Sequence, residues 1–282
     1  MKIAQAWLAL VSGLWLLTTG ASAEPGRTRN LVAHGAVRID VIAEGQGPVV
    51  VMLPSRGRDS EDYDAVAEAI AAQGFRVLRP QPRGIGQSLG PMDDLTLHDF
   101  AGDIAAVIRA ERAGPAVIVG HAFGNWVARM TAVDHPDLVR GVVLAAAAAK
   151  AYPPGLSIAV NKVADPTVPE TERRQYLQQA FFAPGHDPSI WLAGWYPAVS
   201  RSQRLASERS RQAEWWPAGR APLLDLQAGM DPFKPEASRN EIRDEFGDRV
   251  TLVVIPDASH ALIPEQPVAV ADAIIGWVRR LP

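Results

Sequence analysis

The stretch from Pro115 to Arg129 constrains the fold of this chain more than any other. Its residues Ala116 to Val119 form an apolar run that is short and β-branched, which predicts a buried strand rather than a helix. The segment Gly120-His-Ala-Phe-Gly124 follows, and apolar residues then recur at helical spacing. A strand, a tight turn and a helix must therefore meet within this one stretch. Side chains would clash where strand and helix touch, which explains the two glycines.

The turn reads G-x-A-x-G, with Ala122 at its centre. The same strand–turn–helix context surrounds the nucleophile elbow, G-x-S-x-G, in which the central serine is the nucleophile. A methyl group cannot attack a carbonyl carbon. The chain therefore has the backbone frame of a nucleophile site without the nucleophile, and its function has to be derived without a serine at this position.

The N-terminus has the pattern of a secretory signal peptide. Met1-Lys2 supplies a positive charge, Ile3 to Leu17 form an apolar run, and Ala21-Ser-Ala23 is a small-x-small cleavage site. We therefore expect residues 1–23 to be a signal peptide that is cleaved after Ala23, and the mature protein to be periplasmic or secreted. The alternative is an uncleaved single-helix anchor, although the apolar run is short for a membrane span.

Composition limits the class of protein and its partners. A chain of 282 residues with 48% hydrophobic and 21% charged residues is ordinary globular composition, sufficient for one large α/β domain. A net charge of −3 gives no electrostatic case for binding nucleic acid or an anionic membrane. The absence of cysteine excludes disulfides, thiolate metal sites and a thiol nucleophile. We expect a small-molecule substrate, no nucleic acid, no membrane contact after signal cleavage, no cofactor and no metal; the oligomeric state is left open.

Short apolar runs alternate with helical patterns along the mature chain. This alternation predicts an α/β fold, with a mostly parallel twisted sheet and helices on both faces. Glu24 to Asn30 is polar and predicts a flexible leader, and Val37 to Ile42 alternates as in a half-exposed edge strand. Ser60 is the expected N-cap of a helix over residues 61–73, and Thr96 is the expected N-cap of the next helix.

The regular alternation stops between Lys150 and Arg220. This segment is rich in proline and contains half of the eight tryptophans. We interpret the segment, about 150–220, as a helical cap inserted into a domain that spans 24–282 and lying over the carboxyl ends of the strands. Aromatic side chains dominate pocket walls, so one or two of the tryptophans are expected to roof an apolar pocket above Ala122. The four are Trp191, Trp195, Trp215 and Trp216.

Four landmarks together give the chain a resemblance to the α/β-hydrolase family over essentially the whole mature length. They are the Gly120–Gly124 turn, the Arg83-Gly-Ile-Gly-Gln-Ser88 turn, Asp231 after the seventh expected strand, and His260 after the eighth. The order of the family's triad is nucleophile, acid, histidine, and Ala122, Asp231 and His260 follow it. The resemblance implies the α/β-hydrolase fold with its hydrolytic activity.

The resemblance also implies roles for single residues. His260 would be the general base, and Asp231 would orient it and stabilise its imidazolium. Asp225 and Asp257 are weaker candidates for the acid. The oxyanion hole uses backbone N–H groups, and the donors would be those of Phe123 and Arg56.

The sequence departs from the family in two further places. Pro54-Ser55 stands where the family usually has His-Gly, and Gln81 stands where an aspartate is common. Ser55 carries the hydroxyl nearest to the elbow that the sequence suggests, and replacement of a loop glycine is its simpler interpretation. These departures favour natural divergence at Ala122 over an engineered Ser-to-Ala variant of an ordinary serine hydrolase. His121 either lines the pocket or bonds to the sheet.

Two classes of function are left open. In the first, His260 and Asp231 hydrolyse a small, largely apolar ester, lactone or amide-type substrate without a covalent intermediate, because His260 activates water or deprotonates the substrate. In the second, the protein is a catalytically inactive pseudoenzyme that binds a small ligand. The retained acid and base favour the enzyme.

Overall fold

The computed structural model describes residues 26–112 and 114–282, so the predicted signal peptide (1–23) lies outside the described residues. Eight strands form one sheet in the order β1-β2-β4-β3-β5-β6-β7-β8. β2 pairs antiparallel with β1 and β4, and all other neighbours are parallel. The predicted α/β fold with a mostly parallel sheet is confirmed. The strands are β1 (Thr28–His34), β2 (Val37–Glu44), β3 (Val49–Leu53), β4 (Arg76–Pro80), β5 (Ala116–His121), β6 (Val139–Ala145), β7 (Leu223–Ala228) and β8 (Val250–Ile255).

The first two strands correct the sequence predictions. β1 begins at Thr28, inside the segment expected to be a flexible leader. β2 lies between β1 and β4, so it is not the edge strand that its alternation suggested, and nearly all of its side chains are buried. β1 is the exposed edge strand. It is held by its hydrogen-bond ladder to β2, which requires no apolar pattern in its own sequence.

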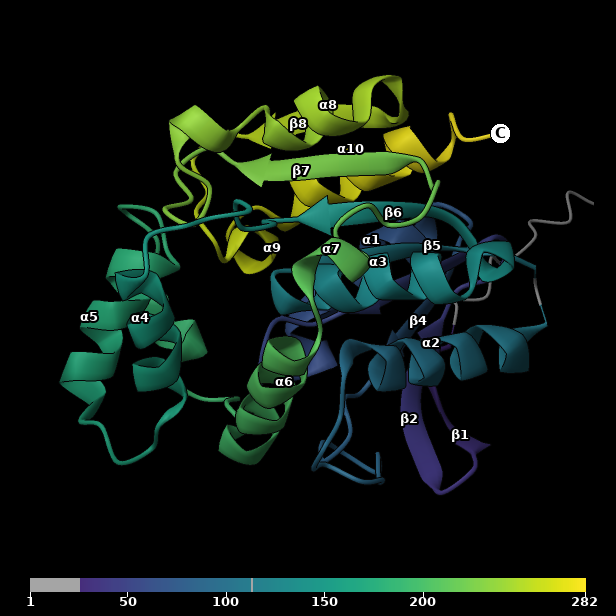
Figure 1. Ribbon diagram of the computed structural model, residues 1–282, viewed down its shortest axis with the longest axis horizontal. Coiled ribbons are helices and arrows are strands. Elements are labelled where there is room, and N and C mark those ends of the chain that lie inside the picture. Colours follow the sequence, from purple (N-terminus) through teal and green to yellow (C-terminus); the bar gives the residue numbers. More distant parts are fainter. Residues whose placement is uncertain (1–25, 113) are drawn as a thin grey trace, which may run out of the picture.

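Helices cover both faces of the sheet (Figure 1). α2 (Leu97–Glu111) and α3 (Phe123–Asp134) contribute to one buried apolar cluster, whereas α1 (Asp64–Ala72) and α10 (Pro267–Val278) contribute to the other. The short helices α8 (Glu241–Phe246) and α9 (Leu262–Glu265) complete the two layers. A central sheet with two helical layers fixes the carboxyl ends of β3, β5, β7 and β8 at one edge of the molecule, where the site is formed.

The helix starts test two cap predictions. Asp59 caps the 3₁₀ turn Ser60–Tyr63 that precedes α1, because its carboxylate accepts the N–H of Glu61 at 2.8 Å. The prediction of Ser60 as N-cap is therefore wrong; its hydroxyl donates to the carbonyl of Pro80 at 2.7 Å. Thr96 is confirmed as the cap of α2. Its backbone N–H donates to the carboxylate of Asp99 at 2.8 Å, which is half of a capping box.

Four helices lie between β6 and β7, and this segment is called the cap below. They are α4 (Gly155–Ala164), α5 (Glu170–Ala180), α6 (Pro197–Arg209) and α7 (Gln212–Trp215). In Figure 1 the arrowheads of β6 and β7 point toward α4 and α5, so these helices lie beyond the carboxyl ends of the strands. α4 and α5 pack around a buried cluster that includes Phe181, Phe182, Trp191 and Phe233.

The cap is joined to the loop that follows β3. The N–H of Tyr196 donates to the carbonyl of Gly57 at 2.9 Å. The guanidinium of Arg58 lies 4.8 Å from the ring centroids of both Trp191 and Trp195, as cation–π contacts require. Arg58 also donates a hydrogen bond to the carbonyl of Ala193 in the cap at 2.6 Å. Within its own segment it donates to the two carboxylate oxygens of Asp62 at 2.7 and 2.8 Å.

No helix within residues 26–112 and 114–282 has the length and apolar character needed to span a membrane. In the same described ranges, no group of three or more His, Asp or Glu side chains is placed to hold a metal ion.

Candidate active site

The turn between β5 and α3 holds Ala122 in a strained backbone conformation, with φ 49° and ψ −112°. Such positive φ values are uncommon for residues with a Cβ. The flanking glycines make the turn possible. A Cβ on Gly120 would lie 2.4 Å from Cα of Asn125, and one on Gly124 would lie 2.5 Å from the carbonyl oxygen of Leu53. The turn therefore brings α3 into direct contact with β3 and β5, and Ala122 lines a cavity at the carboxyl ends of the strands.

His260 and Asp231 meet at the wall of this cavity. Nδ1 of His260 is 2.9 Å from Oδ2 of Asp231, and both side chains are buried. The other carboxylate oxygen of Asp231 accepts the N–H of Phe233 at 2.8 Å. Because a carboxylate only accepts, Nδ1 carries the proton and Nε2 is left as the basic nitrogen. The ring of Phe233 stacks on that of His260, with centroids 4.1 Å apart.

The two weaker acid candidates lie elsewhere. Asp225, within β7, has its carboxylate 3.5 Å from Nζ of Lys234 and accepts a hydrogen bond from Gln227, and burial raises its pKa. Asp257 lies in an exposed turn with φ 51°. Asp231 is therefore the carboxylate that the fold brings to His260.

Two residues that line the cavity on the elbow side have backbone N–H groups without an acceptor in the described residues. Phe123 is the first residue of α3, where N–H groups have no acceptor within the helix. Among residues 26–112 and 114–282, neither the N–H of Phe123 nor that of Arg56 has a hydrogen-bond acceptor, and both residues line the cavity. The N–H of Ser55, in contrast, donates to the hydroxyl of Tyr63 at 2.9 Å. The amides of Phe123 and Arg56 can thus receive an oxyanion, and that of Ser55 is already occupied.

His121 connects the two sides of the site through hydrogen bonds. Its Nε2 is 2.7 Å from the carbonyl oxygen of His260, which can only accept, so Nε2 carries the proton. Its Nδ1 must then accept from the hydroxyl of Tyr63 at 2.9 Å, and that oxygen accepts the N–H of Ser55. Burial lowers the pKa of His121 to about 3, which keeps the ring neutral. His121 is not among the residues that line the cavity, and its bond to the carbonyl of His260 holds the His260 loop, which neither sequence interpretation anticipated.

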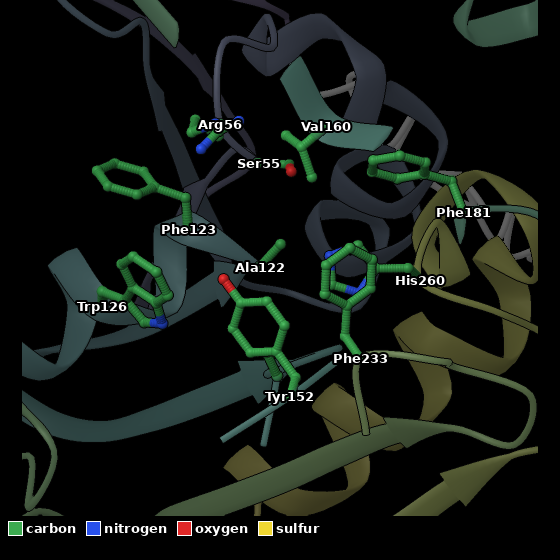
Figure 2. A pocket seen from close by; sticks show the side chains of 11 residues that line it. Ser55, Arg56, Ala122, Phe123, Trp126, Tyr152, Val160, Phe181, Phe233 and His260 are labelled. Atoms are coloured by element: carbon green, nitrogen blue, oxygen red, sulfur yellow. The ribbon is translucent and has the colours of Figure 1, made fainter. Parts of the chain in front are cut away.

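Aromatic and apolar side chains form most of the cavity wall (Figure 2). Apart from the indole N–H of Trp126, the polar groups among them are the Ser55 hydroxyl, the Arg56 guanidinium, the Tyr152 hydroxyl and the His260 ring. In Figure 2, Ser55 and Arg56 lie on one side of Ala122, while Tyr152 lies on the opposite side with its oxygen toward Ala122. The remaining lining residues are Phe123, Trp126, Ala148, Val160, Phe181 and Phe233.

The predicted tryptophan roof is wrong. None of Trp191, Trp195, Trp215 and Trp216 lines the cavity; Trp191 packs against His121 below it, and Trp215 stacks on Trp126 with ring centroids 5.2 Å apart. The tryptophan that lines the cavity is Trp126 of α3. Its spacing from Ala122 was a usable signal, because residues four apart lie on the same face of a helix.

A family model described as "Alpha/beta hydrolase family" matches residues 50–273. The chain belongs to this family. The assignment agrees with the strand order, the elbow and the Asp231–His260 contact.

Two curated relatives show how far sequence similarity extends. A 2-(acetamidomethylene)succinate hydrolase from Mesorhizobium japonicum is 30% identical over 109 residues, which cover 39% of this chain and 39% of that protein. Bifunctional epoxide hydrolase 2 from Sus scrofa is 27% identical over 204 residues, which cover 65% of this chain and 37% of that protein. The matched region thus spans about two-fifths of the length of each of these relatives.

Solved structures agree over more of the chain. A thermophilic esterase from Thermogutta terrifontis has a TM-score of 0.72 at 23% identity, covering 90% of this chain and 98% of the other. E-2-(acetamidomethylene)succinate hydrolase has a TM-score of 0.70 at 20% identity, covering 90% and 100%. At these identities the similarity establishes the fold.

Proposed function

We propose that this protein hydrolyses a small, largely apolar ester, lactone or amide-type substrate, with His260 as general base, Asp231 as its orienting acid and no serine nucleophile. The observation that carries the proposal is the buried contact of 2.9 Å between Nδ1 of His260 and Oδ2 of Asp231 at the cavity wall. A protein that only binds a ligand has no need of this pair. Membership of a family of hydrolases supports the same conclusion.

In the proposed mechanism, Nε2 of His260 takes a proton from water as the water oxygen attacks the substrate carbonyl carbon. The methyl group of Ala122 leaves space for that water where a serine hydroxyl would otherwise lie. The backbone N–H groups of Phe123 and Arg56 stabilise the oxyanion. His260 then returns the proton to the leaving oxygen or nitrogen as its bond to carbon breaks, which releases a carboxylic acid and an alcohol or amine.

The missing nucleophile sets the expected rate. In hydrolases that lose a triad residue, oxyanion stabilisation and binding alone retain about 10³–10⁴-fold catalysis over water. A rate of this order suits substrates with a reactive carbonyl, such as strained lactones or activated esters, more than ordinary peptides.

Two alternatives use the same structure. A pseudoenzyme would bind a small ligand in the cavity without turnover, and an engineered Ser-to-Ala variant would represent an ordinary serine hydrolase. Ala122 is the observation that favours either one. The test below separates the pseudoenzyme from the proposed mechanism.

The test is hydrolysis of a panel of small esters, lactones and amides by native protein and by His260→Ala. We expect the variant to lose at least about 10²-fold in kcat/KM, the scale of one general base. His98→Ala is the matched control, because His98 is an exposed histidine on α2. If native protein and His260→Ala are equally inert while a small ligand still binds, the pseudoenzyme account replaces the proposal.

We also propose that the protein is exported to the periplasm or secreted, with cleavage after Ala23. The charge at Lys2, the apolar run and the Ala-Ser-Ala site support this. Mass spectrometry of the mature protein should find Glu24 at the N-terminus, and an intact Met1 or Lys2 would contradict the proposal.

A further inference from the structure

The side chain of Arg56 occupies an unusual position in the cavity wall. Its Nη2 donates to Oδ1 of Asn161 on α4 at 2.7 Å, while its Nε is buried without a hydrogen-bond partner in the described residues. Burial lowers the pKa of Arg56 to about 10, so the group is still a cation near neutral pH. Arg56 is half-buried, and a partly desolvated cation whose buried Nε is unpaired is costly unless something completes its hydrogen bonds.

Three of the buried arginines in the described residues have a carboxylate partner. Arg58 pairs with Asp62, Arg79 with Glu44 and Arg83 with Asp103, each at 2.7 Å. Within residues 26–112 and 114–282, Arg56 has no ion pair; its acceptor is the neutral amide of Asn161.

Arg129 is the informative exception among the buried arginines. It also lacks a carboxylate, but the Trp216 ring lies 4.2 Å from its guanidinium carbon and the carbonyl of Trp216 accepts its Nη1. Arg129 is thus covered by protein, whereas Arg56 faces the cavity. The partner that Arg56 lacks can therefore come from a ligand.

The chemistry of the cavity defines that partner. Among the residues that line the cavity, Arg56 is the one that is permanently charged. Its planar guanidinium fits the two oxygens of a carboxylate. One cation in a mainly apolar cavity matches a monoanion better than a phosphate dianion. The Tyr152 hydroxyl across the cavity is a further hydrogen-bond donor.

We propose that Arg56 binds a carboxylate of the substrate, so that the substrate class is a half-ester or half-amide of a short dicarboxylic acid. This inference rests on the proposed function for the identity of the scissile group. The backbone N–H of Arg56 is an oxyanion donor, and its side chain binds the carboxylate. The carboxylate therefore lies no farther from the scissile carbonyl than one arginine side chain can reach, which makes Arg56 a specificity-determining residue.

The test measures binding without turnover. The probe is the keto acid 5-oxohexanoate, which cannot be hydrolysed and carries a carbonyl and a carboxylate at the spacing of a glutarate half-ester. Its neutral partner is 5-oxohexanamide. By isothermal titration calorimetry, native protein should bind the acid at least about tenfold more tightly than the amide, as expected for one charge-assisted hydrogen-bonded pair.

Three variants assign that preference. Arg56→Gln should abolish it, and Arg56→Lys should restore it in part because the charge returns without the planar guanidinium. Arg201→Gln should keep it, because Arg201 is an exposed arginine of α6 outside this cavity. Thermal melting of all four proteins establishes that the variants are folded.

The outcomes separate this inference from the proposed function. Equal affinity of native protein for acid and amide overturns the carboxylate site, whatever the hydrolysis panel shows, and so does an unchanged preference in Arg56→Gln. A preference that depends on Arg56, in a protein that hydrolyses neither the panel nor monomethyl glutarate, supports the carboxylate site and removes only the hydrolytic function.

Discussion

The histidine side of the site, with Asp231 and His260, differs from the elbow side, with Ala122 and Phe123, in which features of a hydrolase site it contains. On the histidine side, both carboxylate oxygens of Asp231 are hydrogen-bonded, and the imidazole and carbonyl of His260 each have a partner. On the elbow side, the backbone of Ala122 keeps a strained conformation, yet its side chain has no reactive group. One side preserves side-chain chemistry and the other preserves backbone geometry.

The difference shows that the backbone conformation of the elbow does not depend on the side chain at its centre. Strained backbone persists only where the surrounding structure determines it, and here the contacts at Gly120 and Gly124 do so whatever side chain stands at Ala122. The same geometry makes Phe123 the first residue of α3, and Phe123 lines the cavity. The N–H of Phe123, proposed above as an oxyanion donor, thus does not depend on a nucleophile at residue 122.

The largest expected effect comes from introducing a hydroxyl nucleophile on the elbow side. Ala122→Ser places a hydroxyl beside His260 in a turn that already has its glycines. We expect turnover of an activated ester to rise by about 10²-fold or more, with a burst of acyl-enzyme in stopped-flow kinetics, because a covalent route opens.

The double variant Ala122→Ser/His260→Ala is the control and should show no burst. A folded Ala122→Ser protein without a burst would mean that the loop Pro54–Arg56 has moved the amide of Arg56 out of position, and that the elbow side has lost its working geometry as well.

The next largest effect is expected when the hydrogen bonds that link Ser55 to His260 by way of Tyr63 and His121 are broken. Tyr63→Phe removes the hydroxyl that accepts from Ser55 and donates to His121, leaving two buried polar groups unpaired. We expect a loss of about 2 kcal/mol or more in the free energy of unfolding, measured by urea denaturation, together with a lower kcat. Tyr176→Phe, on a half-buried tyrosine of α5, is the matched control. Equal free energies of unfolding for the two variants would show that the hydrogen bonds of the Tyr63 hydroxyl do not stabilise the protein.

A smaller effect follows from protonation of His121. Its pKa is about 3 in the folded protein against 6.5 for an ordinary histidine, so below pH 6.5 the unfolded chain binds the extra proton. The stabilising contribution is complete above pH 6.5 and is lost as pH falls toward 3, by at most about 1.4 kcal/mol per pH unit.

Urea denaturation at pH 7 and pH 5 measures this slope. His121→Gln, which keeps an amide donor for the carbonyl of His260, should lose less stability than native protein over the same interval. Parallel slopes for the two proteins would place the acid sensitivity in other groups.

The smallest effect is expected for Ser55→Ala. Its hydroxyl lines the cavity without a hydrogen-bond partner in the described residues, so kcat/KM should change by less than about threefold. A loss as large as that of His260→Ala would instead make Ser55 Oγ a participant in the reaction. The elbow side would then have a nucleophile of its own, and the contrast between the two sides would disappear.

The sequence predicts those parts of the fold that short-range geometry dictates. The glycines of the elbow follow from the contact of strand with helix, whereas the choice of Asp231 and His260 came from the resemblance to the α/β-hydrolase family. The α/β alternation is likewise visible, because buried parallel strands are continuous apolar runs.

Features that depend on tertiary packing were not predictable in the same way. β1 is held by backbone hydrogen bonds and has no apolar period, so it resembled a leader. Asp59 rather than Ser60 caps the turn before α1, because the carbonyl of Pro80 takes the serine hydroxyl. The cap tryptophans pack against Arg58 and α3 instead of the cavity, and no local pattern encodes that choice.

The Arg58 contact has a kinetic consequence. Its guanidinium is enclosed by Trp191 and Trp195 of the cap, and it lies two residues beyond Arg56. Any outward movement of the cap that separates these rings from Arg58 uncovers a buried cation and loosens the loop that carries Arg56. For the proposed hydrolysis we therefore expect that a turnover in which the cap opens includes a reclosing step, whose rate sets an upper limit on kcat.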